Sequence, residues 1–170
     1  MEVSTYFKEI PQTPELATAT NSVARFVDSL GFRYYWATEG LTNSEFTFRP
    51  HPTSMDMASL LEHLYSMSKY LNRTFGVSVH NATSDTLEDF RYATLANYES
   101  LSKQFKDIKD SSLNDLNSLS DLKGKHPFWY YLNGPIADSL THVGQVTSWR
   151  RIAGNPQPTG INAFFGTRSE

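Results

Sequence analysis

Four long stretches of this chain carry apolar residues at every third or fourth position, the spacing that aligns side chains along one side of an α-helix. They cover about residues 15–39, 55–72, 85–108 and 127–153, separated by segments that contain Pro, Gly or runs of polar residues. No stretch shows a convincing strand pattern. Because each helix must bury its apolar side, we predict an all-α fold, a four-helix bundle in a single domain of residues 1–170.

The apolar stripes of the first three helices define most of the predicted core. The first stripe, which Gly31 interrupts, comprises Leu16, Val23, Phe26, Val27, Leu30 and Tyr34. The second comprises Met57, Leu60, Leu61, Leu64, Met67 and Leu71. The third comprises Leu87, Phe90, Leu95, Tyr98, Leu101, Phe105 and Ile108.

Capping and turn residues predict where these helices begin. Thr13 followed by Pro14 has the form of a helix start, because a hydroxyl caps the free backbone N–H groups and proline suits the first helical position. Ser54 is expected to cap the second helix, and Ser84 or Asp85 the third.

The remaining segments are predicted to be irregular. Residues 1–13 form an arm, residues 41–52 a loop, and residues 109–125 a long connection that holds a short extra helix or covers one end of the bundle. Arg150 and Arg151 complement the dipole at the end of the fourth helix, which stops at a glycine. In the tail, residues 155–170, Phe164 and Phe165 are expected to pack back onto the bundle.

Composition and charge exclude several classes of protein. The net charge is −3, from 15 basic and 18 acidic residues without a basic stripe, so we expect no nucleic-acid partner. The absence of cysteine excludes disulfides, thiolate zinc sites and a cysteine nucleophile. Without a signal peptide or an apolar run of about 18 residues, the chain is expected to be cytoplasmic and to have no membrane partner.

The fourth helix carries the most informative polar residues. Asp138 and His142 are four residues apart, so their side chains leave the same face of the helix one turn apart. Gln145 continues this row, and Tyr131 and Trp149 flank it. The row contains no Lys or Glu, which an ordinary solvated face would have.

A carboxylate and an imidazole at this spacing can bind one metal ion. His63 is the best third ligand, because it lies at the edge of the apolar side of the second helix, in line with Met67 and Tyr70. Two His and one Asp leave coordination positions open, the pattern of a catalytic site. Nitrogen and oxygen ligands suit zinc, nickel, iron or manganese.

A simpler interpretation needs no metal. An Asp and a His at this spacing commonly form a hydrogen bond or a weak ion pair, and a lone core histidine such as His63 usually has a structural partner. Three further histidines fall in predicted loops or at element edges and are expected to be surface residues: His51, His80 and His126.

Two segments resemble parts of a known family. Residues 133–156 resemble the last helix of the DinB/YfiT-like superfamily, in which a ligand is followed after three residues by a His, then by Gly-Gln and by an Arg before a Gly. The matching residues, in order, are Asp138, His142, Gly144, Gln145, Arg151 and Gly154. Residues 48–64 resemble the start of the family's second helix, with an Arg-Pro loop and a Leu-Leu-x-His run that places His63 at the ligand position. Residues 41–50 resemble the family's usual linker.

The resemblance covers essentially the whole chain and implies an up-down-down-up bundle with one divalent metal ion. Zinc and nickel are the first expectations, iron and manganese the alternatives. The commonest family pattern has three His ligands, whereas this chain has Asp138 at the first of the two positions on the last helix. The harder, negative carboxylate would favour iron, manganese or nickel, weaken zinc binding, or mark a branch that has lost the metal.

The implied function is that of a metal-dependent enzyme of the transferase or hydrolase type acting on a small molecule. Characterised relatives include enzymes that use low-molecular-weight thiols, and here a thiol would have to be a cosubstrate because the chain has no cysteine. Gln145 would orient a ligand or the substrate. The competing hypothesis is a non-catalytic binding or regulatory bundle whose His/Asp row is structural. A homodimer is a further hypothesis.

Overall fold

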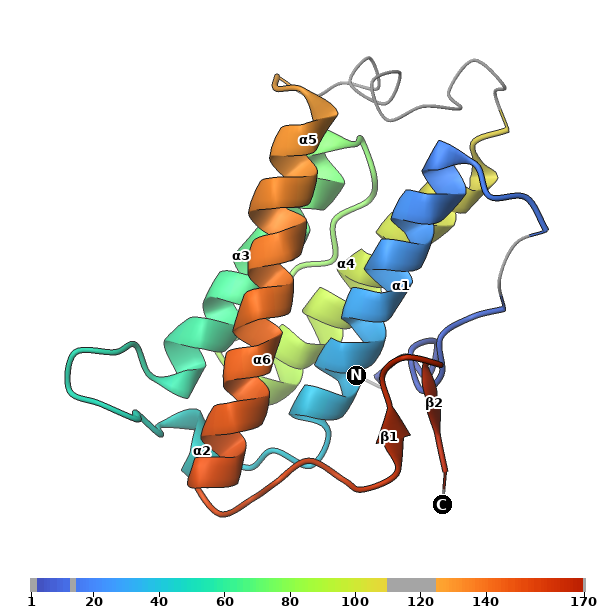
Figure 1. Cartoon of the computed structure of the whole chain (residues 1–170). Coiled ribbons are helices and arrows are strands. Elements are labelled where there is room, and N and C mark those ends of the chain that lie inside the picture. The colour runs from blue at the N-terminus through green and yellow to red at the C-terminus, as the bar shows by residue number, and fades with distance from the viewer. Residues whose placement is uncertain (1–2, 13–14, 110–124, 170) are drawn as a thin grey trace.

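The computed structural model describes residues 3–12, 15–109 and 125–169 (Figure 1). Its helices are α1 (Ala19–Thr38), α2 (Asn43–Phe46), α3 (Met57–Thr74), α4 (Leu87–Asp107), α5 (Phe128–Tyr131), the π-helical η3 (Leu132–Ile136) and α6 (Ala137–Ile152). A hairpin near the C-terminus pairs β1 (Ile161–Asn162) antiparallel with β2 (Thr167–Arg168). The predominantly helical fold confirms the all-α prediction.

The long helices pack pairwise around one core. Helix α1 contacts α4 and α6, and α3 contacts the same two helices from the other side. The predicted stripe of α3 is buried throughout, and that of α4 is buried except for its half-buried last residue, Ile108. Hydrophobic periodicity therefore identified the core faces of these two helices correctly.

Helix α1 begins later than predicted. Thr18 caps it, because its backbone is extended and its Oγ1 accepts the backbone N–H of Asn21 at 3.1 Å. Residues 15–17 are not helical, and Leu16 and Phe26 are exposed instead of lying in the core. Placing these two residues in the core stripe was therefore wrong. The predicted start at residues 13 and 14 lies outside the described residues.

The caps of α3 and α4 also lie one or two residues beyond the predicted ones. Asp56 Oδ1 accepts the backbone N–H of Ser59 at 2.9 Å, and Thr86 Oγ1 accepts that of Asp89 at 3.3 Å. Ser54 instead hydrogen-bonds within the preceding turn, to the carbonyl of His51. Several adjacent residues had side chains able to cap, and only the backbone path decided which one did.

The N-terminal arm packs against α1 at a glycine. Phe7 is fully buried, and a Cβ placed on Gly31 would lie 2.5 Å from its ring. The indole N–H of Trp36 donates to the carbonyl of Lys8 at 3.1 Å. Gly31, which interrupts the apolar stripe, is thus the position where the arm packs directly on the helix backbone.

The predicted loop over residues 41–52 contains the short helix α2. Thr42 and Glu45 form a capping box, in which the Glu45 carboxylate accepts the backbone N–H of Thr42 at 2.7 Å. The helix stops after four residues, before the Arg-Pro segment that prevents its continuation.

The helical extent predicted for residues 127–153 is confirmed, but a kink that was not predicted divides it into α5, η3 and α6. Gly134 has non-helical backbone angles (φ −89°, ψ −106°), and Pro135 supplies no backbone N–H to the helical ladder. The chain passes this point as a wide π-turn before α6 begins.

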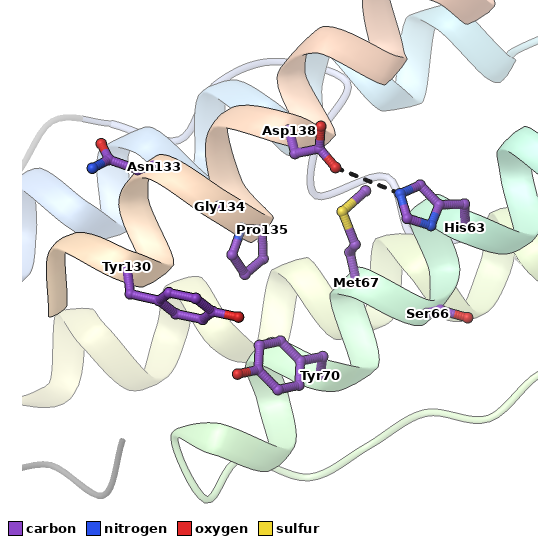
Figure 2. Close-up of a pocket in the computed structure, with 9 residues that line it drawn as sticks. All are labelled: His63, Ser66, Met67, Tyr70, Tyr130, Asn133, Gly134, Pro135 and Asp138. Atoms are coloured by element: carbon purple, nitrogen blue, oxygen red, sulfur yellow. Dashed lines mark ion pairs between the residues drawn. The ribbon is translucent and has the colours of Figure 1, made fainter. Parts of the chain in front are cut away.

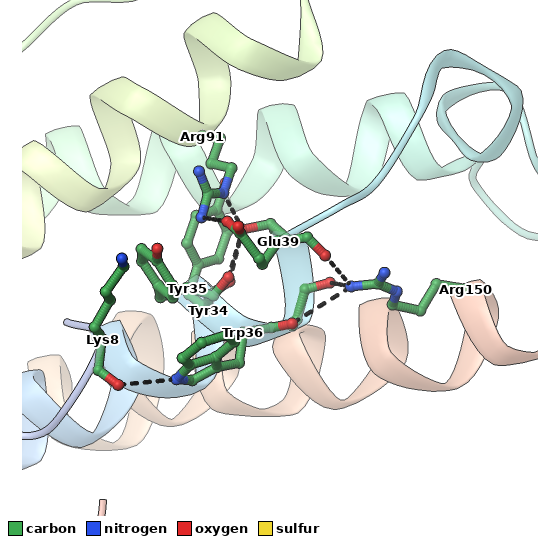
Figure 3. A network of polar contacts seen from close by, with 9 residues as sticks. Lys8, Tyr34, Tyr35, Trp36, Glu39, Arg91 and Arg150 are labelled. Atoms are coloured by element: carbon green, nitrogen blue, oxygen red, sulfur yellow. Dashed lines mark hydrogen bonds and ion pairs between the residues drawn. The ribbon is translucent and has the colours of Figure 1, made fainter. Parts of the chain in front are cut away.

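Arg150 of α6 donates hydrogen bonds to the carbonyls at the end of α1 (Figure 3). Its guanidinium is buried and donates to the carbonyls of Ala37 and Glu39 at 3.0 and 2.8 Å, and to that of Asn155 at 2.7 Å. The sequence predicted that Arg150 would complement the end of its own helix. It mainly satisfies the unpaired carbonyls of a neighbouring helix instead.

The C-terminal phenylalanines do not pack on the bundle, contrary to prediction. Phe164 is 97% exposed and Phe165 is also exposed, because both lie at the tip of the β1–β2 hairpin. Asn162 Oδ1 accepts both of their backbone N–H groups and fixes the turn. No helix in the described part of the chain is long and apolar enough to cross a membrane.

Candidate metal centre

The three predicted ligands converge between α3 and α6. His63 Nε2 and His142 Nε2 each lie 3.5 Å from the same oxygen, Oδ2 of Asp138. One donor atom from each residue lies within 4.8 Å of the other two, and the imidazole centroids are 4.8 Å apart with the rings nearly perpendicular. The structure thus brings all three side chains to one point.

The spacing of these atoms fits ligands of one ion better than direct hydrogen bonds. A nitrogen-to-oxygen hydrogen bond is normally about 2.7–3.2 Å long, shorter than the 3.5 Å found twice here. Ligands about 2.1 Å from a tetrahedral ion lie roughly 3.4 Å apart. Two of the separations are therefore close to those between ligands of one ion, and the donor set of two imidazole nitrogens and one carboxylate oxygen could hold a divalent cation.

Gln145 selects the form of His142 that can bind a metal. Its Oε1 lies 2.7 Å from Nδ1 of His142 and accepts the ring proton there. In a neutral imidazole, a proton on Nδ1 leaves the lone pair on Nε2, the atom that faces Asp138. The glutamine therefore has the supporting role that metal-binding histidines usually need.

Helices α3 and α6 contact each other beside the centre. Ser139, next to Asp138, is fully buried and donates to the Pro135 carbonyl at 2.6 Å. Its hydroxyl also lies 3.7 Å from Sδ of Met67, one turn after His63 on α3. This contact joins α3 and α6 beside the ligands.

The centre opens to solvent on one side. The side chain of His142 is 15% exposed, whereas those of His63 and Asp138 are 44% and 48% exposed. The two exposed residues stand at one end of a groove of about 470 Å³, lined further by Met67, Tyr70 and Tyr130 (Figure 2). A small molecule can therefore reach the centre from the groove.

The aromatic neighbours differ from those predicted. Tyr131 is buried against Phe75 and Phe128, and Trp149 packs partly buried on the core. Tyr130 and Tyr70 line the groove in their place. The Gly-Pro pair inside an apparent helix was the available signal, because it indicates a kink that rotates the preceding residues.

The other histidines lie outside the cluster. His51 and His126 are exposed, as predicted. His80 is half-buried, with its ring nitrogen 3.1 Å from the hydroxyl of Ser100. Among the described residues, the three converging side chains are the group whose geometry suits a metal ion.

No family model, curated protein or solved structure matches this chain. The resemblance to the DinB/YfiT-like superfamily therefore depends on the short motifs in residues 48–64 and 133–156, and membership stays a prediction. The geometry of the centre is independent of that resemblance.

Proposed function

We propose that this protein is an enzyme that binds one divalent metal ion through His63, Asp138 and His142 and acts on a small molecule. The observation that carries the proposal is that two imidazole nitrogens lie 3.5 Å from one carboxylate oxygen. Three protein ligands leave coordination positions open, which is typical of catalytic sites.

The chain's own residues supply the surroundings for this chemistry. When bound, a divalent ion supplies a Lewis acid that polarises a substrate oxygen or lowers the pKa of a coordinated water or thiol. Gln145 keeps the proton of His142 on Nδ1. Asp138 directs Oδ2 towards both imidazoles, so its other oxygen is left to accept a proton or a hydrogen bond from the substrate.

The reaction class that we favour is hydrolysis or group transfer. The protein has no cysteine, so a thiol in such a reaction would be a cosubstrate. Membership of the DinB/YfiT-like superfamily, with a four-helix bundle of up-down-down-up order, would agree with this assignment. Assembly as a homodimer remains a separate prediction.

A structural role for the cluster is the competing hypothesis. Protonated histidines on both sides of Asp138 would form two ion pairs without a metal. Such pairs contribute only about 0–1 kcal/mol when exposed, and His63 and Asp138 are both substantially exposed. The hydrogen bond between Nδ1 of His142 and Gln145 agrees with both hypotheses, since a neutral and a protonated imidazole can each donate from Nδ1.

Metal analysis of protein purified without a histidine tag tests the proposal. We expect about one equivalent of a divalent metal per chain, and a rise in thermal midpoint when zinc, nickel or manganese is added to stripped protein, because ligands that bind only the folded state stabilise it. His63→Ala and His142→Ala should each abolish both effects.

His51→Ala is the matched control, because this exposed histidine lies outside the cluster. It should retain the metal. Less than about a tenth of an equivalent in the wild-type protein, with no thermal shift on adding any of the three metals, would favour the structural role.

A further inference from the structure

The groove beside the centre has two exposed tyrosines at the end away from His63 and Asp138. Figure 2 shows Tyr70 and Tyr130 there, with Met67 and Pro135 between them and the ligands. Exposed aromatic rings are costly to hydrate. Their position at one end of a groove that leads to the centre indicates that they contact a ligand.

Both tyrosines are held by a buried ring. Tyr131 is almost fully buried, and its centroid lies 6.2 Å from that of Tyr70 and 5.2 Å from that of Tyr130. The ring of His126 lies 4.3 Å from Tyr130 on another side. Because these contacts restrict the two rings before a ligand arrives, binding between them costs less conformational entropy.

The kink at Gly134 and Pro135 lies in the wall of the groove, between Tyr130 and Asp138. Tyr130 precedes the kink and Asp138 follows it, yet both line the groove. In a regular helix, residues eight positions apart are about 12 Å apart along the axis. Between them Gly134 has non-helical backbone angles, and a Cβ there would meet no atom within 4 Å.

The described lining of the groove is mostly uncharged. Among the described residues, no Lys or Arg lines the groove, and its ionisable groups besides the tyrosines are His63 and Asp138. Arg73 and Lys125 line a different depression on the other side of Tyr70. The groove's volume of about 470 Å³ lies within the range of small-molecule sites.

We propose that this groove is the substrate subsite of the centre and binds an aromatic ring of the substrate between Tyr70 and Tyr130, with the reacting group at the His63–Asp138 end. This inference rests on the proposed function. It goes further by specifying an aromatic substrate and by identifying two residues that determine specificity.

Hydroxamates that differ only in their side group test the subsite on nickel-loaded protein. Acetohydroxamate reaches the metal without a ring, benzohydroxamate adds a flat ring, and cyclohexanecarbohydroxamate adds a ring of similar size that is not flat. Affinities measured by calorimetry are divided by each chelator's affinity for free nickel. We expect benzohydroxamate to bind about 10-fold more tightly than each of the other two, since offset-stacked and edge-to-face aromatic pairs add affinity beyond the burial of their area.

Tyr70→Ala and Tyr130→Ala should each reduce this preference several-fold, and the double variant should abolish it, without changing nickel content or acetohydroxamate affinity. Trp129→Ala is the control, because Trp129 is an exposed aromatic beside Tyr130 that does not line the groove. If an alanine variant loses its fold, Tyr70→Leu and Tyr130→Leu replace it, with the same expectation against benzohydroxamate.

Two results would overturn the inference alone. In one, nickel and acetohydroxamate bind but the phenyl ring adds no affinity. In the other, the cyclohexyl compound binds as tightly as the phenyl compound. A protein that binds none of zinc, nickel and manganese would contradict the proposed function and this inference together, and metal content distinguishes that failure from the first two.

Discussion

At the scale of single residues, the centre depends on which nitrogen of His142 carries a proton. Asp138 and His142 could be predicted from sequence because helix geometry alone places residues four apart on one face. The hydrogen bond of 2.7 Å from Nδ1 to Gln145 is also local to α6. His63 was harder to place, because its approach depends on how α3 packs against α6.

The role of Gln145 can be measured directly. Gln145→Ala removes the acceptor that holds the proton on Nδ1, so the competing tautomer, with its proton on Nε2, becomes accessible. We expect metal affinity to fall about 10- to 100-fold, as for other partners of metal-binding histidines. Competition with a fluorescent chelator would give the affinities. Ser148→Ala, an exposed change on the same helix, should leave them unchanged.

Arg150 is a second residue whose role sequence could not specify. Its buried guanidinium donates hydrogen bonds to carbonyls at the end of α1, more than a hundred positions away in the sequence. Arg150→Ala should lower the free energy of unfolding by about 3–5 kcal/mol, because several buried carbonyls lose their donor. Urea denaturation would measure this. Arg151→Ala, at the exposed neighbouring position, should change stability by less than about 0.5 kcal/mol. Equal effects of the two changes would contradict the assigned role.

At the scale of elements, periodicity predicted α3 and α4 well, but it missed the start of α1 and the kink within residues 127–153. The α3 stripe is continuous and buried because that helix packs between α4 and α6. In α1 the same period extended to Leu16, but Thr18 caps the helix first. In residues 127–153 the apolar spacing continued across a kink that only Gly134 and Pro135 revealed. The spacing of apolar residues does not reveal a kink in a helix when the residues on both sides of it fit the helical period.

Two glycines within helices should respond oppositely to alanine. Gly31→Ala would place a methyl group against the ring of Phe7, so we expect destabilisation of about 1–3 kcal/mol despite the better helix propensity of alanine. Gly144→Ala meets no atom within 4 Å and should stabilise the protein by up to about 1 kcal/mol. Thermal and urea unfolding of the pair would show the contrast. Stabilisation by Gly31→Ala would mean that Phe7 does not pack there.

At the scale of the whole molecule, one polar network connects segments distant in sequence. Arg150 binds the end of α1 and the carbonyl of Asn155, whose side-chain amide donates to Glu45 of α2 at 3.1 Å. The network therefore ties α1, α2 and α6 together at one end of the molecule. The loop prediction over residues 41–52 missed the capping box of Thr42 and Glu45, and the link to Asn155 exists only after the chain has folded.

Glu45 makes this network sensitive to acid. Burial alone would raise the pKa of its carboxyl, but hydrogen bonds from Asn155, Thr42 and Ser44 outweigh that effect and lower the pKa from 4.5 to about 2. Because the pKa is lower in the folded state, the unfolded state binds more protons between these values. Glu45 therefore stabilises the protein fully above about pH 4.5, and this contribution is lost as the pH falls towards 2.

Glu45→Gln tests this contribution, because glutamine keeps the shape but not the charge. At pH 7 we expect the variant to be less stable than the wild type by about 1–3 kcal/mol, the range for hydrogen bonds to a charged group. The difference should shrink as urea denaturation is repeated from pH 5 down to pH 2.5, because protonation gradually removes the same charge from the wild type. Glu62→Gln, at an exposed position of α3, should match the wild type at every pH. If the deficit of Glu45→Gln stayed constant over this range, its cause would be lost geometry, and the carboxylate charge would not be what holds α2 to the end of α6.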